Sequence, residues 1–270
     1  MAEAVDLGAL FDGVVVTEAT PSPRTIRFAT PPLGDGPGRA FDPSNAHEDP
    51  RVAPLFAASD EVTAVLVGPA FVAVTILHAD HWEALLPTLL RAVTAAFGDD
   101  DPARSGPANP AVLTLSVGAA DAGSTGPRRL ERAWSELGAV RPDRAEGLDR
   151  IVDASRDDEP ARRQVAAVLL ADADPAAGAR HWARLLDDPS RAVRRAVVDT
   201  VGDAHRDALR PLLERALADT DAWIRWRALR GIAALGVTAS RNAVEPLTGD
   251  PDFRVRLEAA RVLAGVPDGG

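Results

Sequence analysis

The hydrophobic pattern of the first hundred residues changes its period several times. Short runs rich in β-branched and aromatic residues alternate with turns that contain Pro and Gly, which is typical of strands, and one later run has helical spacing. We predict strands at 14–18, 25–28, 62–67 and 71–77, and helices at 51–59 and 82–97. Gly68-Pro69 forms the turn of a hairpin, and Asp80 is predicted to cap the second helix. These elements indicate a small α+β domain.

A segment with little regular pattern follows. Residues 98–110 contain three consecutive aspartates and three prolines, which is typical of a linker. A strand is predicted at 112–117 and a helix at about 130–137. The chain is therefore divided into an α+β domain at 1–98, a linker with a strand-helix module at 99–142, and a helical region at 143–270.

From residue 143 onward a helical pattern repeats every 31 residues. An acidic column contains Asp157, Asp188, Asp219 and Asp250, and a basic column contains Arg163, Arg194, Arg225 and Arg256. Apolar columns contain Ala166, Val197, Ala228 and Ala259 on the first helix of each unit, and Ile151, Trp182, Leu213 and Val244 on the second. Two-helix units stack in this way because each buries small and branched residues against the next. We therefore predict an all-α solenoid after the α+β domain.

The two charged columns predict a structural ladder along the stack. An aspartate just before each first helix can accept hydrogen bonds from the free N–H groups of that helix. The arginine six residues later can reach the aspartate of the neighbouring unit and donate a charge-assisted hydrogen bond. The ladder would therefore join consecutive units.

Composition excludes several kinds of chemistry. The chain of 270 residues has no cysteine, and all 30 of its Lys and Arg residues are arginine. Thiol nucleophiles, cysteine-ligated clusters and a catalytic or phosphate-binding lysine are therefore excluded. The net charge is −10, and neither half has the basic stripe that nucleic acid requires. Acids near the N terminus and the lack of a long apolar run predict a cytoplasmic protein without membrane contact.

The repeat resembles the HEAT family, whose units carry an Asp-Pro turn followed by Val-Arg. Asp188-Pro189 leads to Val193-Arg194, and Asp250-Pro251 leads to Val255-Arg256. The unit that begins at Asp219 lacks the proline, and a length of 31 residues is typical of the compact HEAT-like variety. The resemblance covers about residues 143 to 266 and implies a HEAT-like solenoid.

The first domain resembles the N-terminal domain of Nfu-type iron-sulfur scaffold proteins. The residues that carry the resemblance are 17–28, Pro54-Leu55-Phe56, Val62, Val65, Gly68-Pro69, Phe71-Val72, Val74-Thr75 and Trp82-Glu83. In that family the cluster ligands lie in a separate Cys-x-x-Cys domain, and this chain has neither that domain nor a cysteine. The resemblance therefore does not imply that this chain binds a cluster.

The order of the parts resembles a third family. An Nfu-like domain, a module that contains Arg132-Ala133-Trp134 and Leu137-Gly138, and C-terminal HEAT-like repeats together are similar to the conserved virulence factor C family of bacterial proteins. The motifs of that family establish architecture rather than activity.

His78-x-Asp80-His81 is the one metal-like motif in the sequence. A metal site needs ligands that converge from more than one segment, and His47-Glu48-Asp49 lies in a loop of unknown position. We therefore expect His78 to end a strand, His81 to lie exposed in a first helical turn, and the protein to hold neither a metal nor a cofactor.

Two surfaces are candidates for binding a partner. The first is the loop Thr20, Pro21, Ser22 and Pro23, whose prolines could equally serve a structural purpose. The second combines tryptophan and arginine on adjacent repeats, which is the composition of interface hot spots, although a tryptophan could instead fill a gap between helices. Its members are Trp223, Trp226, Arg227, Arg230, Arg195, Arg254 and Arg261.

Two classes of function are consistent with these features. The first is a non-enzymatic adaptor or scaffold for protein partners, and the Nfu resemblance implies iron-sulfur proteins or their assembly factors as those partners. The alternative is a repeat enzyme or ligand binder with a groove lined by Arg and Trp, as in HEAT-like DNA glycosylases, against which the near-neutral charge of the repeats argues. We favour the adaptor because two interaction-type folds occur without a catalytic motif, and we expect a colourless protein without stoichiometric iron.

Overall fold

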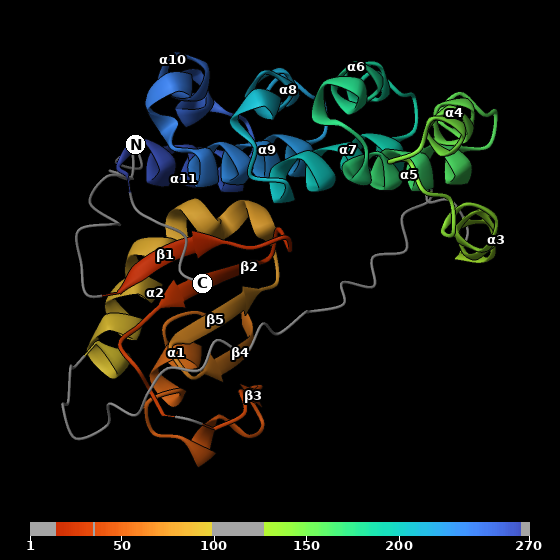
Figure 1. The fold of residues 1–270 in the computed structure, drawn as a ribbon. Helices are drawn as coiled ribbons and strands as arrows, with labels where there is room; N and C mark the ends of the chain where they lie inside the picture. The colour runs from red at the N-terminus through yellow and green to blue at the C-terminus, as the bar shows by residue number, and fades with distance from the viewer. Residues whose placement is uncertain (1–14, 35, 99–126, 266–270) are drawn as a thin grey trace. The chain divides into compact units, whose positions relative to one another are not determined.

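A computed structural model describes residues 15–34, 36–98 and 127–265 (Figure 1). They form two compact units, the first made of residues 15–98 with 248–265 and the second of residues 127–247. These units divide the chain differently from the three segments expected from sequence, because the last helix, α11 (Phe253–Leu263), contacts the first strand of the N-terminal sheet. The predicted strand at 112–117 lies outside the described residues.

The first unit contains a five-stranded antiparallel sheet with the order β1-β2-β5-β4-β3. Its strands are β1 (Val16–Ala19), β2 (Thr25–Ala29), β3 (Arg39–Phe41), β4 (Val62–Gly68) and β5 (Phe71–Ile76). Ile26 lies opposite Val74 and Phe28 opposite Val72, and all four side chains are buried. This alternation of buried residues on neighbouring strands supplies the core face of the sheet.

Helices α1 (Ala53–Ala57) and α2 (Trp82–Phe97) complete the N-terminal domain. One face of α2 is fully buried, with the spacing expected of an amphipathic helix. The structure confirms the predicted strands β1, β2, β4 and β5 and both helices. Strand β3 was not predicted, because it follows a stretch rich in Gly and Pro.

The predicted cap of α2 is wrong. Asp80 lies within the short 3₁₀ helix η3 (Ala79–His81), and the residue at the N-cap of α2 is His81, whose side chain makes no capping hydrogen bond. The added helical turn shifts Asp80 away from the free N–H groups of α2.

The second unit is all-helical, and its α-helices form a repeating pair pattern. They are α3 (Pro127–Leu137), α4 (Ala145–Ala154), α5 (Pro160–Leu169), α6 (Pro175–Leu185), α7 (Arg191–Asp203), α8 (Arg210–Ala216), α9 (Ala222–Leu235) and α10 (Arg241–Val244). Helices α5, α7 and α9 lie side by side in one row, and α4, α6, α8 and α10 form a second row (Figure 1). The fold is thus an α+β domain followed by a helical solenoid.

The 31-residue columns occupy the interfaces between these helices. Ala166, Val197 and Ala228 are completely buried on α5, α7 and α9. Close approach of α7 and α9 also depends on small residues, because a Cβ added to Gly231 would lie 3.2 Å from the Cα of Gly202 and 2.9 Å from a methyl group of Leu213. The sequence repeat is therefore a packing repeat.

Candidate protein-interaction surface

Each repeat begins with the same hydrogen-bonded turn. A carboxylate oxygen of Asp188 accepts from the N–H of Ser190 at 2.8 Å, and the carbonyl oxygen of Asp188 accepts from Nη1 of Arg194 at 2.9 Å. The equivalent bonds recur in the turns that begin at Asp157, Asp219 and Asp250. The aspartate and the arginine six residues later thus fold the turn within one repeat.

The aspartates of the ladder do not cap the first helices directly, contrary to the expectation from sequence. The N-cap residues of α5, α7, α9 and α11 are Glu159, Ser190, Asp221 and Asp252, each two residues after a ladder aspartate. The aspartate carboxylate instead binds the N–H of the N-cap residue itself, so it shapes the chain before the helix begins.

Two arginines also join consecutive repeats. Arg163 donates from Nε and Nη2 to Asp188 at 2.7 and 2.9 Å, and Arg194 donates in the same way to Asp219 at 2.8 and 3.2 Å. The hydrogen bond to the aspartate raises the pKa of both guanidinium groups, in spite of the opposing effect of burial. Both pairs join an arginine to the aspartate of the next repeat, as the ladder predicts, and both lie within the described residues of the second unit.

The other two arginines of the basic column, Arg225 and Arg256, also bind the turns of their own repeats. Arg225 donates to the carbonyl oxygens of Asp219 and Thr220. Arg256 on α11 donates to the carbonyl of Asp250 and, through Nη2, to Glu83 of α2 at 2.8 Å. Within the first unit, the ladder arginine therefore binds the N-terminal domain.

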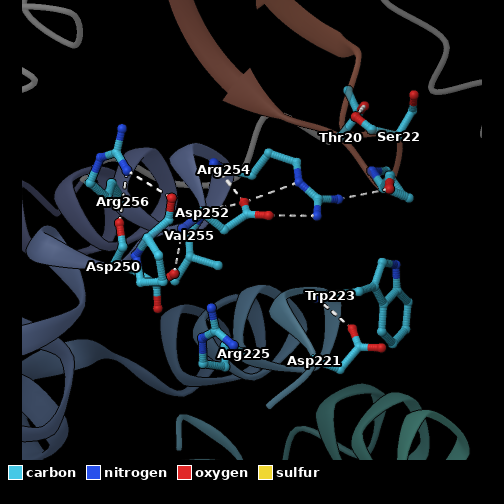
Figure 2. A network of polar contacts seen from close by, with 12 residues as sticks. Thr20, Ser22, Asp221, Trp223, Arg225, Asp250, Asp252, Arg254, Val255 and Arg256 are labelled. Atoms are coloured by element: carbon cyan, nitrogen blue, oxygen red, sulfur yellow. Dashed lines mark hydrogen bonds and ion pairs between the residues drawn. The ribbon is translucent and has the colours of Figure 1, made fainter. Parts of the chain in front are cut away.

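Side chains from α7 and from the start of α9 form a cluster that we call the Trp223 patch. Its members are Arg191, Arg195, Asp221 and Trp223. Asp221 caps α9, because its carboxylate accepts the N–H of Trp223 at 2.8 Å (Figure 2). Arg195 of α7 donates to the same carboxylate at 3.1 Å, and its guanidinium lies 4.9 Å from the centre of the Trp223 ring. Arg191 reaches Asp221 at 3.2 Å. The helix cap, the ion pairs and the stacked ring hold one another in place.

Other members of the predicted tryptophan and arginine surface are not part of this patch. Trp226 is only 3% exposed, so it belongs to the core, with its ring centre 6.2 Å from that of Trp223. Arg230 lies over the Trp226 ring at 5.3 Å. Arg227 binds Asp199, at 2.8 Å, and Asp203, both on α7, and thus links two helices of the stack.

Arg254 and Arg261 were also predicted to belong to the tryptophan and arginine surface, but both are buried on α11. Arg261 is 1% exposed and pairs with the buried Glu258 one turn earlier. Arg254 is 8% exposed and binds both carboxylate oxygens of Asp252 (Figure 2). A third bond runs from Arg254 Nη1 to the carbonyl oxygen of Pro21 at 3.0 Å.

That bond reaches the predicted partner-binding loop at Thr20, Pro21, Ser22 and Pro23. The Thr20 hydroxyl donates to the carbonyl of Thr25 at 2.8 Å, which closes the loop, and Pro21 and Pro23 are exposed. The loop is therefore shaped by its own hydrogen bonds and held to α11 by Arg254.

Glu61, His78 and His81 form a second polar cluster, which the sequence pattern did not predict. Glu61 accepts hydrogen bonds from both imidazoles of the predicted motif, with 3.0 Å to Nδ1 of His78 and 3.2 Å to Nδ1 of His81. The hydrogen bond from His78, followed by the charges and the bond from His81, lowers the pKa of Glu61 against the effect of desolvation. Glu61 is 17 residues from His78, and no local spacing connects them.

Comparison with known families finds one match in each of the two parts of the chain. Residues 15–100 match the family described as the scaffold protein Nfu/NifU N terminal, and residues 179–264 match the family of HEAT repeats. This chain carries an Nfu N-terminal domain followed by HEAT repeats. No curated protein matches it.

The HEAT match begins within α6 and extends through α11, so it includes the Trp223 patch and most of the ladder. Both matched families suggest a role in protein interaction or scaffolding. None of the helices in the described part of the chain combines the length and the apolar composition of a membrane span.

Proposed function

We propose that this protein is a non-enzymatic adaptor that binds a protein partner through the Trp223 patch of its HEAT repeats. The observation that carries the proposal is the stacking of Arg195 on Trp223 while both groups are bound to Asp221. Tryptophan and arginine dominate the energetics of protein interfaces, and side chains that are already ordered lose less entropy on binding.

The charges of the patch favour a protein over a nucleic acid. Both arginines of the patch are paired with the same aspartate, and the neighbouring Arg194 and Arg227 are also paired with carboxylates. Phosphate backbones are bound by uncompensated positive charge. A protein partner would instead place an apolar side chain against the indole and polar groups against the ion pairs.

The Nfu N-terminal domain supports a second part of the proposal. Its exposed Pro21 and Pro23 form a rigid loop, which we assign as the contact for a second partner. The family of this domain supports a role in iron-sulfur protein maturation or its regulation. With no cysteine in this chain, the partner would supply the thiolate ligands of any cluster.

Proximity labelling in the native host, followed by pull-downs with purified candidates, tests the adaptor role. We expect Trp223→Ala to weaken partner binding by at least about tenfold, since hot-spot residues contribute 2 kcal/mol or more. Trp134→Ala is the control, because Trp134 is a tryptophan on another helix, α3, and is 40% exposed. Its partner binding should equal that of the unaltered protein.

Several outcomes would contradict the proposal. They are the recovery of no partner, equal binding by the Trp223→Ala protein, and equal losses for Trp223→Ala and Trp134→Ala. Binding of duplex DNA or a small molecule that is lost only in the Trp223→Ala protein would support the ligand-binding alternative instead. Thermal melts of both variants show whether each remains folded.

A further inference from the structure

The base of the β4-β5 hairpin brings Glu61 and His78 together. Val62, the first residue of β4, pairs with Ile76, the last residue of β5, and both are buried. Pairing continues one step further, because the N–H of Leu77 donates to the carbonyl of Glu61 at 2.8 Å. The N–H of His78 also donates to the Glu61 carboxylate at 3.3 Å. The backbone of the sheet thus determines the distance between these two side chains.

The 3₁₀ helix η3 adds the third side chain. The N–H of His81 donates to the carbonyl of His78 at 3.1 Å, and residues three apart in a 3₁₀ turn lie on the same side. The two imidazole centres are 5.2 Å apart. Trp82, which follows His81, is completely buried and anchors the turn. Two separate segments therefore converge on one point, which is the condition that the sequence motif alone did not meet.

We propose that Glu61, His78 and His81 bind one divalent transition-metal ion of the zinc class. One ligand atom from each residue can be chosen so that all three lie within 4.8 Å of one another. Two imidazole nitrogens and one carboxylate oxygen are a ligand set that suits zinc, nickel and copper rather than magnesium or calcium. Water would fill the remaining coordination positions, because His78 and His81 are exposed.

The distances agree with tetrahedral coordination. Bonds of about 2.0–2.1 Å to nitrogen and oxygen separate the ligand atoms of a tetrahedral zinc site by about 3.4 Å. One oxygen of Glu61, Oε1, already lies 3.2 Å from Nδ1 of His78 and 3.2 Å from Nδ1 of His81. Metal binding therefore needs only small side-chain rotations and the loss of the imidazole protons that now bind Glu61.

The surrounding charge also favours a cation. Asp60 and Asp80, the chain neighbours of Glu61 and His81, are exposed acids and add negative potential. This site is independent of the Trp223 patch, so the adaptor proposal and the metal proposal can fail separately.

The test is a titration of the untagged full chain with Zn²⁺ after treatment with a chelator, with competition against a chromophoric chelator as the readout. We expect one equivalent to bind. Glu61→Gln, His78→Gln and His81→Gln should each weaken binding by at least about tenfold, because even outer-shell changes cost metal sites this much. His47→Gln alters another exposed histidine of the same domain and should leave affinity unchanged.

Nitrogen NMR of the histidine side chains provides a readout that needs no variant. Zn²⁺ should shift the ring signals of His78 and His81 and leave His47, His181 and His205 in place. Co²⁺ should give the visible absorption of a site with nitrogen and oxygen ligands. The proposal is overturned if less than one equivalent binds, if His81→Gln binds zinc as tightly as the parent, or if the His78 and His81 signals do not move.

Discussion

Arg163 donates two hydrogen bonds to the carboxylate of Asp188, which lies 25 residues further along the chain. Arg194 repeats this arrangement with Asp219, one repeat later. Both pairs are largely buried, so each charge depends on its partner for compensation. The same arginines also hold the turn of their own repeat, and therefore turn geometry and repeat stacking are coupled through one side chain.

Arg194→Ala should destabilise the protein. The change leaves the Asp219 carboxylate without its bidentate partner and the Asp188 carbonyl without its Nη1 donor, at a cost of about 1–3 kcal/mol. Urea unfolding would measure the loss, with Arg206→Ala at an exposed position as the control. A double-mutant cycle with Asp219→Asn isolates the pair, and additive losses would show that the lateral bond contributes nothing.

Asp252 should make the protein sensitive to acid. Burial raises the pKa of this carboxyl, but the hydrogen bonds and charge of Arg254 and two backbone N–H bonds outweigh it, so the pKa lies below the ordinary value of 3.8. A depressed pKa contributes stability above the unfolded value, and that stability is lost as the pH falls through the folded value. The Asp252→Asn protein should therefore show a smaller loss of stability below about pH 4 than the parent. Equal acid unfolding of the two proteins would contradict this.

Loss of the Arg254 contacts should lower the stability of the protein more than loss of the charge on Glu83, the partner of Arg256. Arg254→Ala leaves the carbonyl of Pro21 and the carboxylate of Asp252 without their buried donor, and it should cost about 1–3 kcal/mol. Glu83→Gln removes the charge from the more exposed Arg256 pair, and it should cost at most about 1 kcal/mol. Thermal melts of the two variants provide the comparison, and a larger loss for Glu83→Gln would reverse the assignment.

Trp226→Ala should unfold or strongly destabilise the repeats. Removing a buried tryptophan costs about 3–5 kcal/mol because a large cavity remains. Trp223→Ala should lower the melting temperature by only a few degrees, since its ring is partly exposed. Equal melting temperatures for the two variants would show that the two rings have the same environment.

The purified protein should have no iron-sulfur absorption. Clusters of this kind are held mainly by thiolates, and the chain has no cysteine. Visible spectra combined with iron and acid-labile sulfide assays check this expectation. Visible cluster bands together with iron and sulfide in the isolated chain would contradict it.

The sequence by itself determined the regular parts of this protein. Runs rich in β-branched and aromatic residues predicted four strands, the spacing of leucines predicted α2 at its observed bounds, and the period of 31 residues predicted the solenoid. These features are local or strictly periodic, so the pattern of side chains is enough to specify them. The aspartate and arginine columns are visible for the same reason.

Tertiary structure alone decided which of the candidate side chains reach solvent. Trp223 and Trp226 are three residues apart on one helix, yet the packing of neighbouring helices buries only the second almost completely. Arg254 and Arg261 are likewise buried by packing around α11, although arginine is usually exposed. Glu61 lies close to His78 and His81 because β4 and β5 pair as an antiparallel hairpin, which places the residue before β4 beside the residues after β5. That contact depends on strand pairing, and no local spacing in the sequence indicates it.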